Sequence, residues 1–284
     1  MTQTTPRSLL THGIAVPRRS STLPARTHRA AAALGYLLVP LIVLVALWQV
    51  AATSAASPFF PPPLAIAENL WGLLSTGGTA GPLGDFLATV GRMLLGFALG
   101  SAWGIVVGVL MGLNRVARDA MTPIVEFLRS VPATAALPLF ITLLGGGDDM
   151  RVAFIAYGVS WFVLINTASG VGTIHKTVLE MGRIFQVSPA RQLFTIVIPA
   201  AMPKIFAGLR IASTAALLLA IVSEFMLATN GIGYLLIQAQ GRFQMLDMWS
   251  WMLALALLGL LINLLLERIE HRTLAWHRLS RAKI

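Results

Sequence analysis

One acidic residue, Glu224, lies well inside an apolar run of this sequence and is the first candidate for chemistry. An ionisable group inside the membrane is costly and is often functional. A carboxylate repels an anion, so a gate or a packing role suits Glu224 better than direct contact with an anionic solute. Two interpretations stay open. Glu224 is either a functional group of the membrane interior or an acid at the outer boundary, hydrated or paired with Arg92 or Arg242.

Four uncharged polar residues also lie within apolar runs. They are candidates for a polar path across the membrane, and equally for hydrogen bonds between helices. These residues are Asn166, Thr167, Ser213 and Thr214.

The sequence lacks the motifs of several enzyme classes. It contains no G-x-x-x-x-G-K-[ST] and no H-E-x-x-H, so we expect no ATPase site and no metal site in this chain. Residues 158–162, with Ser160 in the middle, begin like a turn that carries a serine nucleophile, but Phe162 stands where a small residue is needed, and all five histidines lie outside the apolar runs. We therefore predict no catalytic residue and no cofactor.

The composition is that of a membrane protein. Of 284 residues, 56% are hydrophobic and 11% are charged, against about 25% charged in an ordinary soluble domain. The net charge of +10 comes from basic residues placed between and beyond the apolar runs, which argues against nucleic-acid binding. Lipid is the expected partner of these runs.

Apolar runs long enough to cross a bilayer predict an all-α membrane protein with six transmembrane helices. A disordered cytoplasmic arm (1–32) precedes the transmembrane domain (33–270), and a basic cytoplasmic tail (271–284) follows it. A short helix through Glu68 and Trp71 is expected after the first span, and three prolines predict that the third span is kinked or begins outside the lipid. The spans are 33–53, 87–113, 121–144, 152–172, 205–226 and 248–266.

The second span carries a glycine at every fourth position. On a helix these glycines form one face that allows close approach of another backbone, so we expect helix packing there. They are Gly96, Gly100, Gly104, Gly108 and Gly112.

Lysine and arginine are unevenly distributed between the two sides of the six-span arrangement. With both termini in the cytoplasm, the arm, Arg115, Arg118, the 175–204 loop and the tail all lie inside, as the positive-inside rule requires. We predict a multi-pass inner-membrane protein in this orientation.

The loop at 175–204 is too charged for lipid and predicts a helix-turn-helix. Residues 180–186 form one expected helix, and Ser188 is an N-cap followed by Pro189 at the first position of a second, 190–197. Pro199 and Pro203 are expected to break the chain as it re-enters the membrane.

This loop resembles that of the permeases of binding-protein-dependent ABC importers, with the pattern E-A-A, three residues, G, nine residues, I-x-L-P. Glu180 takes the acidic position, and Ile196, Ile198 and Pro199 take the last positions. Met181 and Gly182 replace the alanines, and Gln186 replaces the glycine. Glutamine pays a steric cost for positive φ, so the turn is open to a different winding. Segments 127–132, 207–211, 223–225 and 231–235 look like the nitrate, sulfonate and taurine branch.

The resemblance implies a coupling loop, in which a short cytoplasmic helix sits in a groove of an ATP-binding cassette subunit. The residues that would make this contact are Glu180, Gly182, Gln186, Val187, Ser188, Pro189 and Arg191. It further implies two ATPase subunits inside, a soluble substrate-binding protein outside, and a second permease copy that forms a homodimer. The solute would be a sulfonate, taurine or nitrate-type anion.

Two other functions remain alternatives. An ion-coupled secondary transporter would use Glu224, and its uptake would survive ATP depletion but not loss of the ion gradient. If the chain is a non-transporting membrane scaffold, replacement of Glu180 would leave uptake unchanged, while partner binding elsewhere would be lost.

Overall fold

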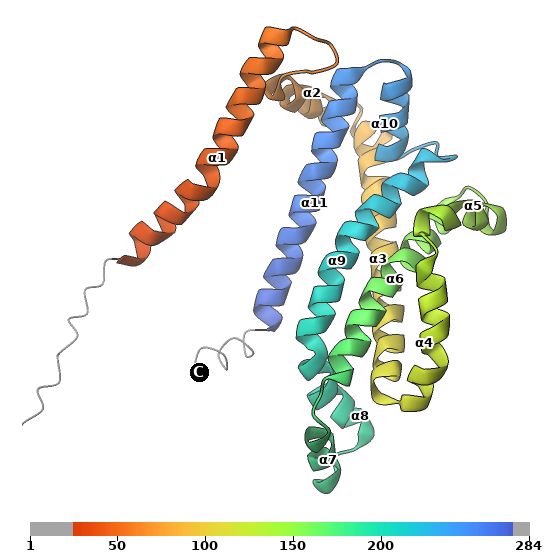
Figure 1. Cartoon of the computed structure of the whole chain (residues 1–284). Helices are drawn as coiled ribbons and strands as arrows, with labels where there is room; N and C mark the ends of the chain where they lie inside the picture. The colour runs from red at the N-terminus through yellow and green to blue at the C-terminus, as the bar shows by residue number, and fades with distance from the viewer. Residues whose placement is uncertain (1–24, 275–284) are drawn as a thin grey trace, which may run out of the picture. The chain divides into compact units, whose positions relative to one another are not determined.

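The computed structural model describes residues 25–274, and every element within that range is helical. Residues 1–24 of the predicted arm and 275–284 of the predicted tail lie outside the described residues. The elements are α1 (Ala25–Ala55), α2 (Pro63–Ser75), the 3-10 turn η1 (Gly78–Ala80), α3 (Pro82–Leu113), α4 (Arg115–Ser130), α5 (Ala133–Leu144), α6 (Asp148–Gly172), α7 (Lys176–Ile184), α8 (Pro189–Gln192), the π segment η2 (Leu193–Val197), α9 (Ile198–Phe225), α10 (Ile232–Gly241) and α11 (Met245–Thr273) (Figure 1).

The chain divides into two units, and the boundary falls between Val50 and Ala51 of α1. The described part of the first unit is the helical stretch 25–50, which begins inside the predicted arm. The second unit holds all the other elements. Its helix α2 begins at Pro63, directly after the proline-rich turn, and confirms the short helix expected through Glu68 and Trp71.

The predicted glycine face of α3 packs directly against α6. A Cβ added at Gly100 would lie 2.4 Å from the carbonyl oxygen of Ala156, and one at Gly104 would lie 2.7 Å from that of Ser160. Such separations leave no room for a side chain, so the two backbones approach as closely as glycine allows. The packing role expected for this stripe is confirmed.

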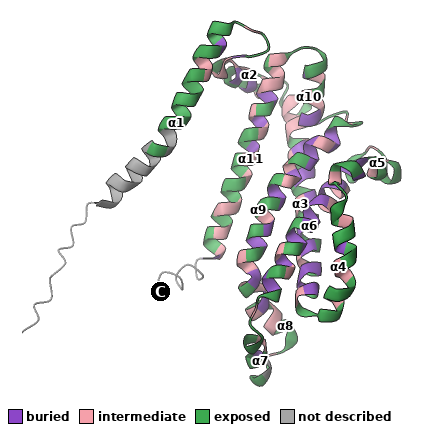
Figure 2. Ribbon diagram, viewed as in Figure 1, coloured by how far each residue is buried: buried purple, intermediate pink, exposed green. Residues whose placement is uncertain are grey.

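Helices α3, α6 and α9 form the centre of the second unit. Phe154, Ile155 and Val159 of α6 are fully buried against Ala212 and Ala216 of α9, in one apolar cluster. Figure 2 shows buried residues concentrated on these three helices, while α4, α5, α7 and α11 are largely exposed. In a membrane protein such exposed apolar surface faces lipid or other subunits.

The third predicted span is bent by 93° between α4 and α5. A proline disfavours the helical region for the residue before it. Val131, directly before Pro132, is accordingly extended, at φ −77° and ψ 119°. Pro123 and Pro138 lie inside helices that continue through them. Of the three prolines behind the predicted kink, only Pro132 separates two helices.

Within residues 25–274, four helical runs are long and apolar enough to cross a membrane, or five if the α4–α5 pair counts as one span. The single runs are α3, α6, the continuous stretch 189–225 and α11. The first predicted span falls in α1, where the shorter apolar stretch is Val39–Ala55.

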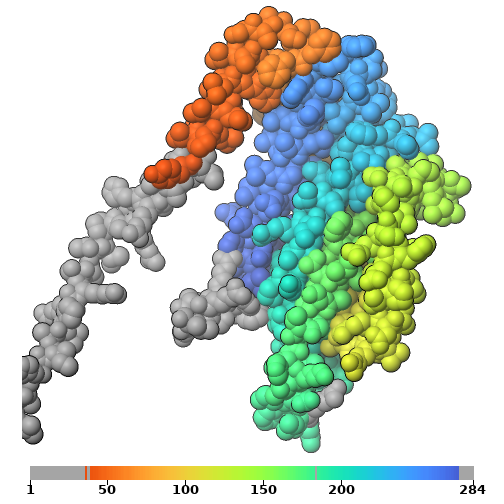
Figure 3. Space-filling model, viewed as in Figure 1, coloured from red at the N-terminus to blue at the C-terminus, as the bar shows by residue number. Residues whose placement is uncertain are grey.

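The two ends of the second unit differ in what they carry. The α3–α4 turn and the hairpin of α7 and α8 lie at one end, and α2, α5 and α10 lie at the other (Figure 1). In the space-filling view α6 lies between α4 on one side and α9 on the other (Figure 3). The hairpin therefore extends the bundle at the end that holds Arg115 and Arg118.

Candidate coupling hairpin and buried ion-pair network

The turn between α7 and α8 has the geometry of a Schellman motif. Gln186 adopts φ +54°, and the Val187 N–H donates to the Gly182 carbonyl at 2.9 Å. Glutamine thus takes the left-handed conformation for which glycine is the usual residue. The substitution at Gln186 leaves the turn in this conformation.

Packing explains a second departure from the family pattern, the glycine at position 182 in place of alanine. Gln192 of α8 reaches back across the turn, and its Nε2 donates to the Leu179 carbonyl at 2.9 Å. A Cβ on Gly182 would lie 3.1 Å from that Nε2, closer than an ordinary contact. Glycine therefore lets Gln192 close the hairpin.

Ser188 caps the second helix as predicted, because its hydroxyl accepts a hydrogen bond from the Arg191 N–H at 3.4 Å. The predicted break at Pro199 and Pro203 is wrong. Helix α8 continues through the π segment Leu193–Val197 into α9 as one run, 189–225. Pro199 is accommodated because it falls in the first turn after the π segment, where the hydrogen-bond pattern changes register.

One face of α7 presents apolar side chains away from the bundle. Met181, Ile184 and Phe185 are 50%, 76% and 74% exposed, and their spacing of three and four places them on one side of the helix. Glu180, Ser188, Pro189 and Arg191 are exposed as well. Such a surface at the tip of a membrane protein is typical of a protein contact site.

The hairpin is anchored to the bundle by a small apolar cluster. Val197 is buried with Val171 and Ala201, and Leu179 and Leu193 pack against them. The motif residues on either side, Ile196, Ile198 and Pro199, are half-buried. This cluster joins the hairpin to the ends of α6 and α9.

At the opposite end, Glu224 is fully buried and paired with Arg92. The Arg92 Nη1 donates to Glu224 Oε1 at 2.8 Å, and the Thr89 hydroxyl lies 2.9 Å from both carboxylate oxygens. Of the two partners considered for Glu224, the structure selects Arg92. The acid lies one residue before the end of α9, so it belongs to the boundary of the span.

The same carboxylate caps the first turn of α10. Glu224 Oε2 accepts from the Gly233 N–H at 2.9 Å, Thr89 accepts from the Ile232 N–H at 2.8 Å, and Asp85 accepts from the Gly231 N–H at 3.0 Å. A Cβ on Gly231 would lie 2.5 Å from the carboxylate, so this glycine leaves the space that Glu224 fills. Three side chains from two helices therefore satisfy amides that a helix start leaves free.

A second arginine extends the network outward. Asp148 bridges Arg92 and Arg151, with both distances 2.9 Å, and Arg151 Nη2 donates to the Leu227 carbonyl at 3.2 Å. Arg92 also donates to the side chain of Asn230. Both guanidiniums are nearly fully buried while Asp148 is 64% exposed, so the network leads from the core to the surface.

The other polar candidates do not join this network. Asn166 donates to the Phe162 carbonyl and Ser213 to the Arg210 carbonyl, each within its own helix. The Thr167 hydroxyl is buried with no hydrogen-bond partner among residues 25–274. Thr214 is exposed.

The partners Thr89, Asn230 and Asp148 were not anticipated from the sequence. A usable signal was present, because Asp85, Thr89 and Arg92 are spaced by four and three residues, which places them along one face of the start of α3. Polar residues so arranged in an apolar helix indicate a polar neighbour. Only the fold shows that this neighbour is the end of α9.

Comparison with known protein families gives the identity of this architecture. Residues 100–272, more than half of the chain, match the model of the binding-protein-dependent transport system inner membrane component. The chain belongs to this family. It is therefore the membrane-spanning permease subunit of an ATP-driven importer.

Several permeases resemble this permease over most of their length. A probable ABC transporter permease protein of Brucella melitensis is 30% identical over 86% of this chain and 97% of its own. The taurine transport system permease protein of Escherichia coli is 29% identical, covering 83% and 87%. A nitrate import permease protein of a Synechocystis species is 27% identical, covering 88% and 96%.

Among solved structures, the permease resembles a chain of the MetNI methionine ABC transporter in an inward-facing conformation. The TM-score is 0.58 at 18% sequence identity, over 68% of this chain and 95% of the other. This likeness concerns the fold alone.

Proposed function

We propose that this permease imports a small sulfonate or nitrate-type anion, driven by separate ATP-binding cassette subunits that dock on the hairpin. A soluble substrate-binding protein delivers the solute at the outer face. Two permease copies form a homodimer, and the translocation path runs between them.

The hairpin carries this proposal. It extends beyond the ends of the spans and presents Met181, Ile184 and Phe185 to the outside (Figure 1). Its turn is held by the Val187 and Gln192 hydrogen bonds, so the contact surface is preorganised. Seven residues make up the proposed docking site: the exposed Glu180, Gln186, Ser188, Pro189 and Arg191, the half-buried Val187, and Gly182, which is buried beneath Gln192.

The proposed solute follows from the similar permeases. One serves taurine, which is itself an alkyl sulfonate, and another serves nitrate. Nitrate is an anion, and taurine carries a sulfonate group beside its ammonium group; in both, the negative charge is spread over oxygen atoms. An anion of this class is therefore the first to test.

The proposed topology has six spans, which in chain order are α1, α3, the α4–α5 pair, α6, the 189–225 run and α11. Residues 1–32 and 271–284 are the cytoplasmic arm and tail, and 33–270 is the permease domain. The basic α3–α4 turn and the hairpin share one end, which the positive-inside rule assigns to the cytoplasm.

Replacing Glu180 by Arg tests the docking. We expect loss of the co-purifying ATPase and of ATP-dependent uptake, because the change reverses a charge inside a protein contact. Glu68→Arg is the matched control, since Glu68 is also exposed and lies on α2 at the opposite end of the second unit. A Glu180→Arg permease that keeps a full complement of ATPase and transports normally would refute the docking assignment.

Coupling to an ion gradient through Glu224 is not favoured. The carboxylate is held by Arg92, Thr89 and the Gly233 amide, and a group so bound has a structural task. The experiment that separates the two mechanisms is uptake after ATP depletion with the ion gradient kept intact, and we expect uptake to stop.

A further inference from the structure

Two cavities lie in sequence along one face of α6. The first, about 400 Å³, is lined by Gly158, Trp161, Phe162 and Ile165 of α6, with parts of α5 and α9. The second, about 410 Å³, is lined by Ile165, Ala168, Ser169 and Gly172 of α6, with Met111 of α3 and parts of α4. Each volume is in the range of small-molecule sites.

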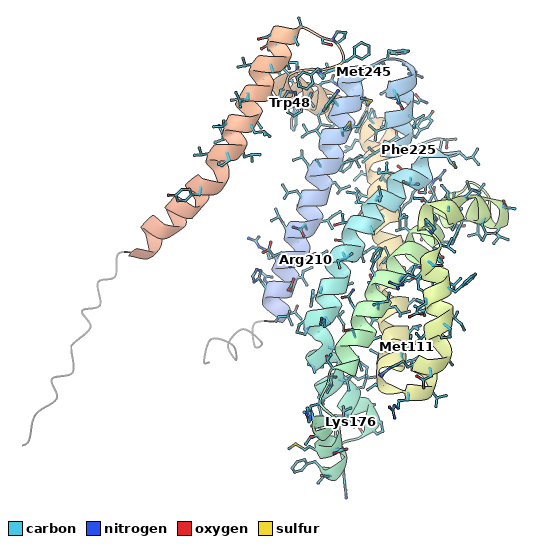
Figure 4. The ribbon with its side chains drawn as sticks, in the orientation of Figure 1. Trp48, Met111, Lys176, Arg210, Phe225 and Met245 are labelled. Carbon is cyan, nitrogen blue, oxygen red and sulfur yellow. The ribbon has the colours of Figure 1, made fainter. Side chains whose placement is uncertain are left out.

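The order of the lining residues gives the direction of this path. Residues 158–165 are the middle of α6, and residues 165–172 are its end toward the hairpin. Met111, which lines the second cavity, lies toward the same end as Lys176, whereas Phe225 lies toward the other (Figure 4). The two cavities together lead from the centre of the span to the hairpin end.

Arg129, the next-to-last residue of α4, lines both cavities. The other arginine that lines these cavities, Arg118, is bound, since it donates to the carbonyls of Met111 and Gly112. Among residues 25–274, the Arg129 side chain has no hydrogen bond or ion pair. Arg129 is exposed in the single protomer, so an unpaired guanidinium at the edge of both cavities is available to a solute and is a functional candidate.

A second donor without a partner belongs to a residue in the wall of the central cavity. Trp161 is 9% exposed and is held edge-on by Trp103 and Tyr157. Within the described range, its indole N–H is buried and has no acceptor. Thr134 adds a hydroxyl, no acid lines this cavity, and the remaining walls are apolar. A site with donors, a fixed positive charge and no carboxylate suits an anion that carries only acceptors.

We propose that Arg129, assisted by Trp161, is the residue that selects an oxyanion in the translocation path. The proposal rests on the function proposed above and names the part of the permease that recognises the solute. The guanidinium fork binds two oxygens of a nitrate or sulfonate group in parallel, which lysine cannot do. The central cavity, where no acid accompanies Arg129, is the proposed recognition site. The second cavity, whose lining also includes Arg118 and Glu126, continues the path toward the hairpin.

The test is uptake of labelled taurine and nitrate by the complete importer, with its ATPase and binding protein, in proteoliposomes. Arg129→Gln is expected to lower uptake about tenfold or more, the effect of one lost charge-assisted hydrogen bond. Co-purification of the ATPase and basal ATP hydrolysis stay at the unsubstituted level. Arg115→Gln is the matched control, because Arg115 lies on the same helix, is exposed and lines neither cavity.

Two further variants keep the proposal falsifiable if Arg129→Gln does not assemble. Arg129→Lys retains the charge without the fork, so the ratio of nitrate uptake to taurine uptake is expected to change. Trp161→Phe removes only the N–H and is expected to raise the concentration of solute for half-maximal uptake. An unchanged ratio together with an unchanged half-maximal concentration would overturn the proposal.

The remaining outcomes separate this inference from others. Normal uptake by Arg129→Gln contradicts it while leaving the proposed function intact, whereas an unsubstituted importer without ATP-dependent uptake contradicts the function itself. A lipid phosphate is the rival occupant of the site. If the Arg129→Gln effect occurs in vesicles of phosphatidylcholine with phosphatidylglycerol and vanishes in phosphatidylcholine alone, Arg129 holds a headgroup and the proposal fails.

Discussion

Replacement of Glu224 by Gln is predicted to destabilise the permease strongly although it removes no atom from the core. Gln has one acceptor oxygen, whereas the Glu224 site presents three donors, namely Arg92 Nη1, the Thr89 hydroxyl and the Gly233 N–H. The amide NH₂ must therefore face one of these donors. The change leaves a buried cation with a weaker partner and a helix start with a free amide.

The magnitude follows from the burial of the pair. The Glu224 side chain is 0% exposed and that of Arg92 is 5% exposed. Removing one partner of such a pair costs about 3–5 kcal/mol. Arg92 keeps Asp148 and Asn230, so we expect the lower limit, about 3 kcal/mol, which corresponds to about 6–12 °C in unfolding temperature for a chain of this size.

The assay is thermal unfolding of the purified permease in detergent, followed by tryptophan fluorescence. Glu68→Gln makes the same chemical change at an exposed position of α2 and is expected to leave the unfolding temperature unchanged. The double variant Arg92→Gln with Glu224→Gln should lose less than the sum of the single losses, since the two groups interact. An unfolding temperature of Glu224→Gln equal to that of the Glu68→Gln control would refute the structural assignment of this pair.

Three further predictions concern the packing of α3 and the turn of the hairpin. Gly100→Leu is expected to lower the free energy of unfolding by about 1–3 kcal/mol or more, because its Cβ would lie 2.4 Å from the Ala156 carbonyl. Gly91→Ala is the control, since no atom lies within 4 Å of its added Cβ, and it should be neutral or stabilising. Thermal unfolding measures both changes. Gln186→Gly relieves the left-handed backbone and should stabilise the turn by about 1 kcal/mol, seen as slower hydrogen exchange of the Val187 amide. Ser188→Ala loses the cap, about 1 kcal/mol, and should speed exchange of the Arg191 amide; equal exchange rates would contradict the cap.

Local rules predicted the parts of the structure that depend on local chemistry. The N-cap at Ser188 and the helix after the prolines at 61–63 follow from side-chain and φ constraints that act within one turn. The glycine stripe of α3 likewise predicted a close neighbour. The stripe alone does not identify α6 as that neighbour, because it describes only one of the two surfaces in contact.

The prolines show where such rules stop. Pro132 separates two helices, while Pro123, Pro199 and Pro203 lie inside continuous ones. A proline frees one carbonyl and crowds the turn before it, and whether the helix continues depends on how neighbouring turns absorb that change. Before Pro199 a π segment absorbs it, and nothing in the sequence of that segment marks it as one.

The partner of Glu224 was undetermined for a different reason. Arg92 and Arg242 are both basic residues near span ends on the expected outer side, and charge alone does not distinguish them. The choice depends on α3 packing beside α9, which brings the Arg92 guanidinium to 2.8 Å from the acid. The Gln186 turn is similar, because its left-handed backbone is fixed by hydrogen bonds from Val187 and Gln192 across the hairpin.

The two ends of the run from α8 to α9 suit opposite mechanical tasks. At the hairpin end, α7 is held by a few apolar side chains and by the Gln192 bond, so it can follow a subunit that grips Met181, Ile184 and Phe185. At the other end, Glu224 ties the same run to α3 and α10 through a buried ion pair and a capped helix start. Residues 189–225 are one continuous helical run that passes through Pro199 and Pro203. If an ATPase subunit docks as proposed, we therefore expect a displacement of the hairpin to reach the face of α9 that lines the central cavity beside Arg129, where a small rotation would change the space available to a solute.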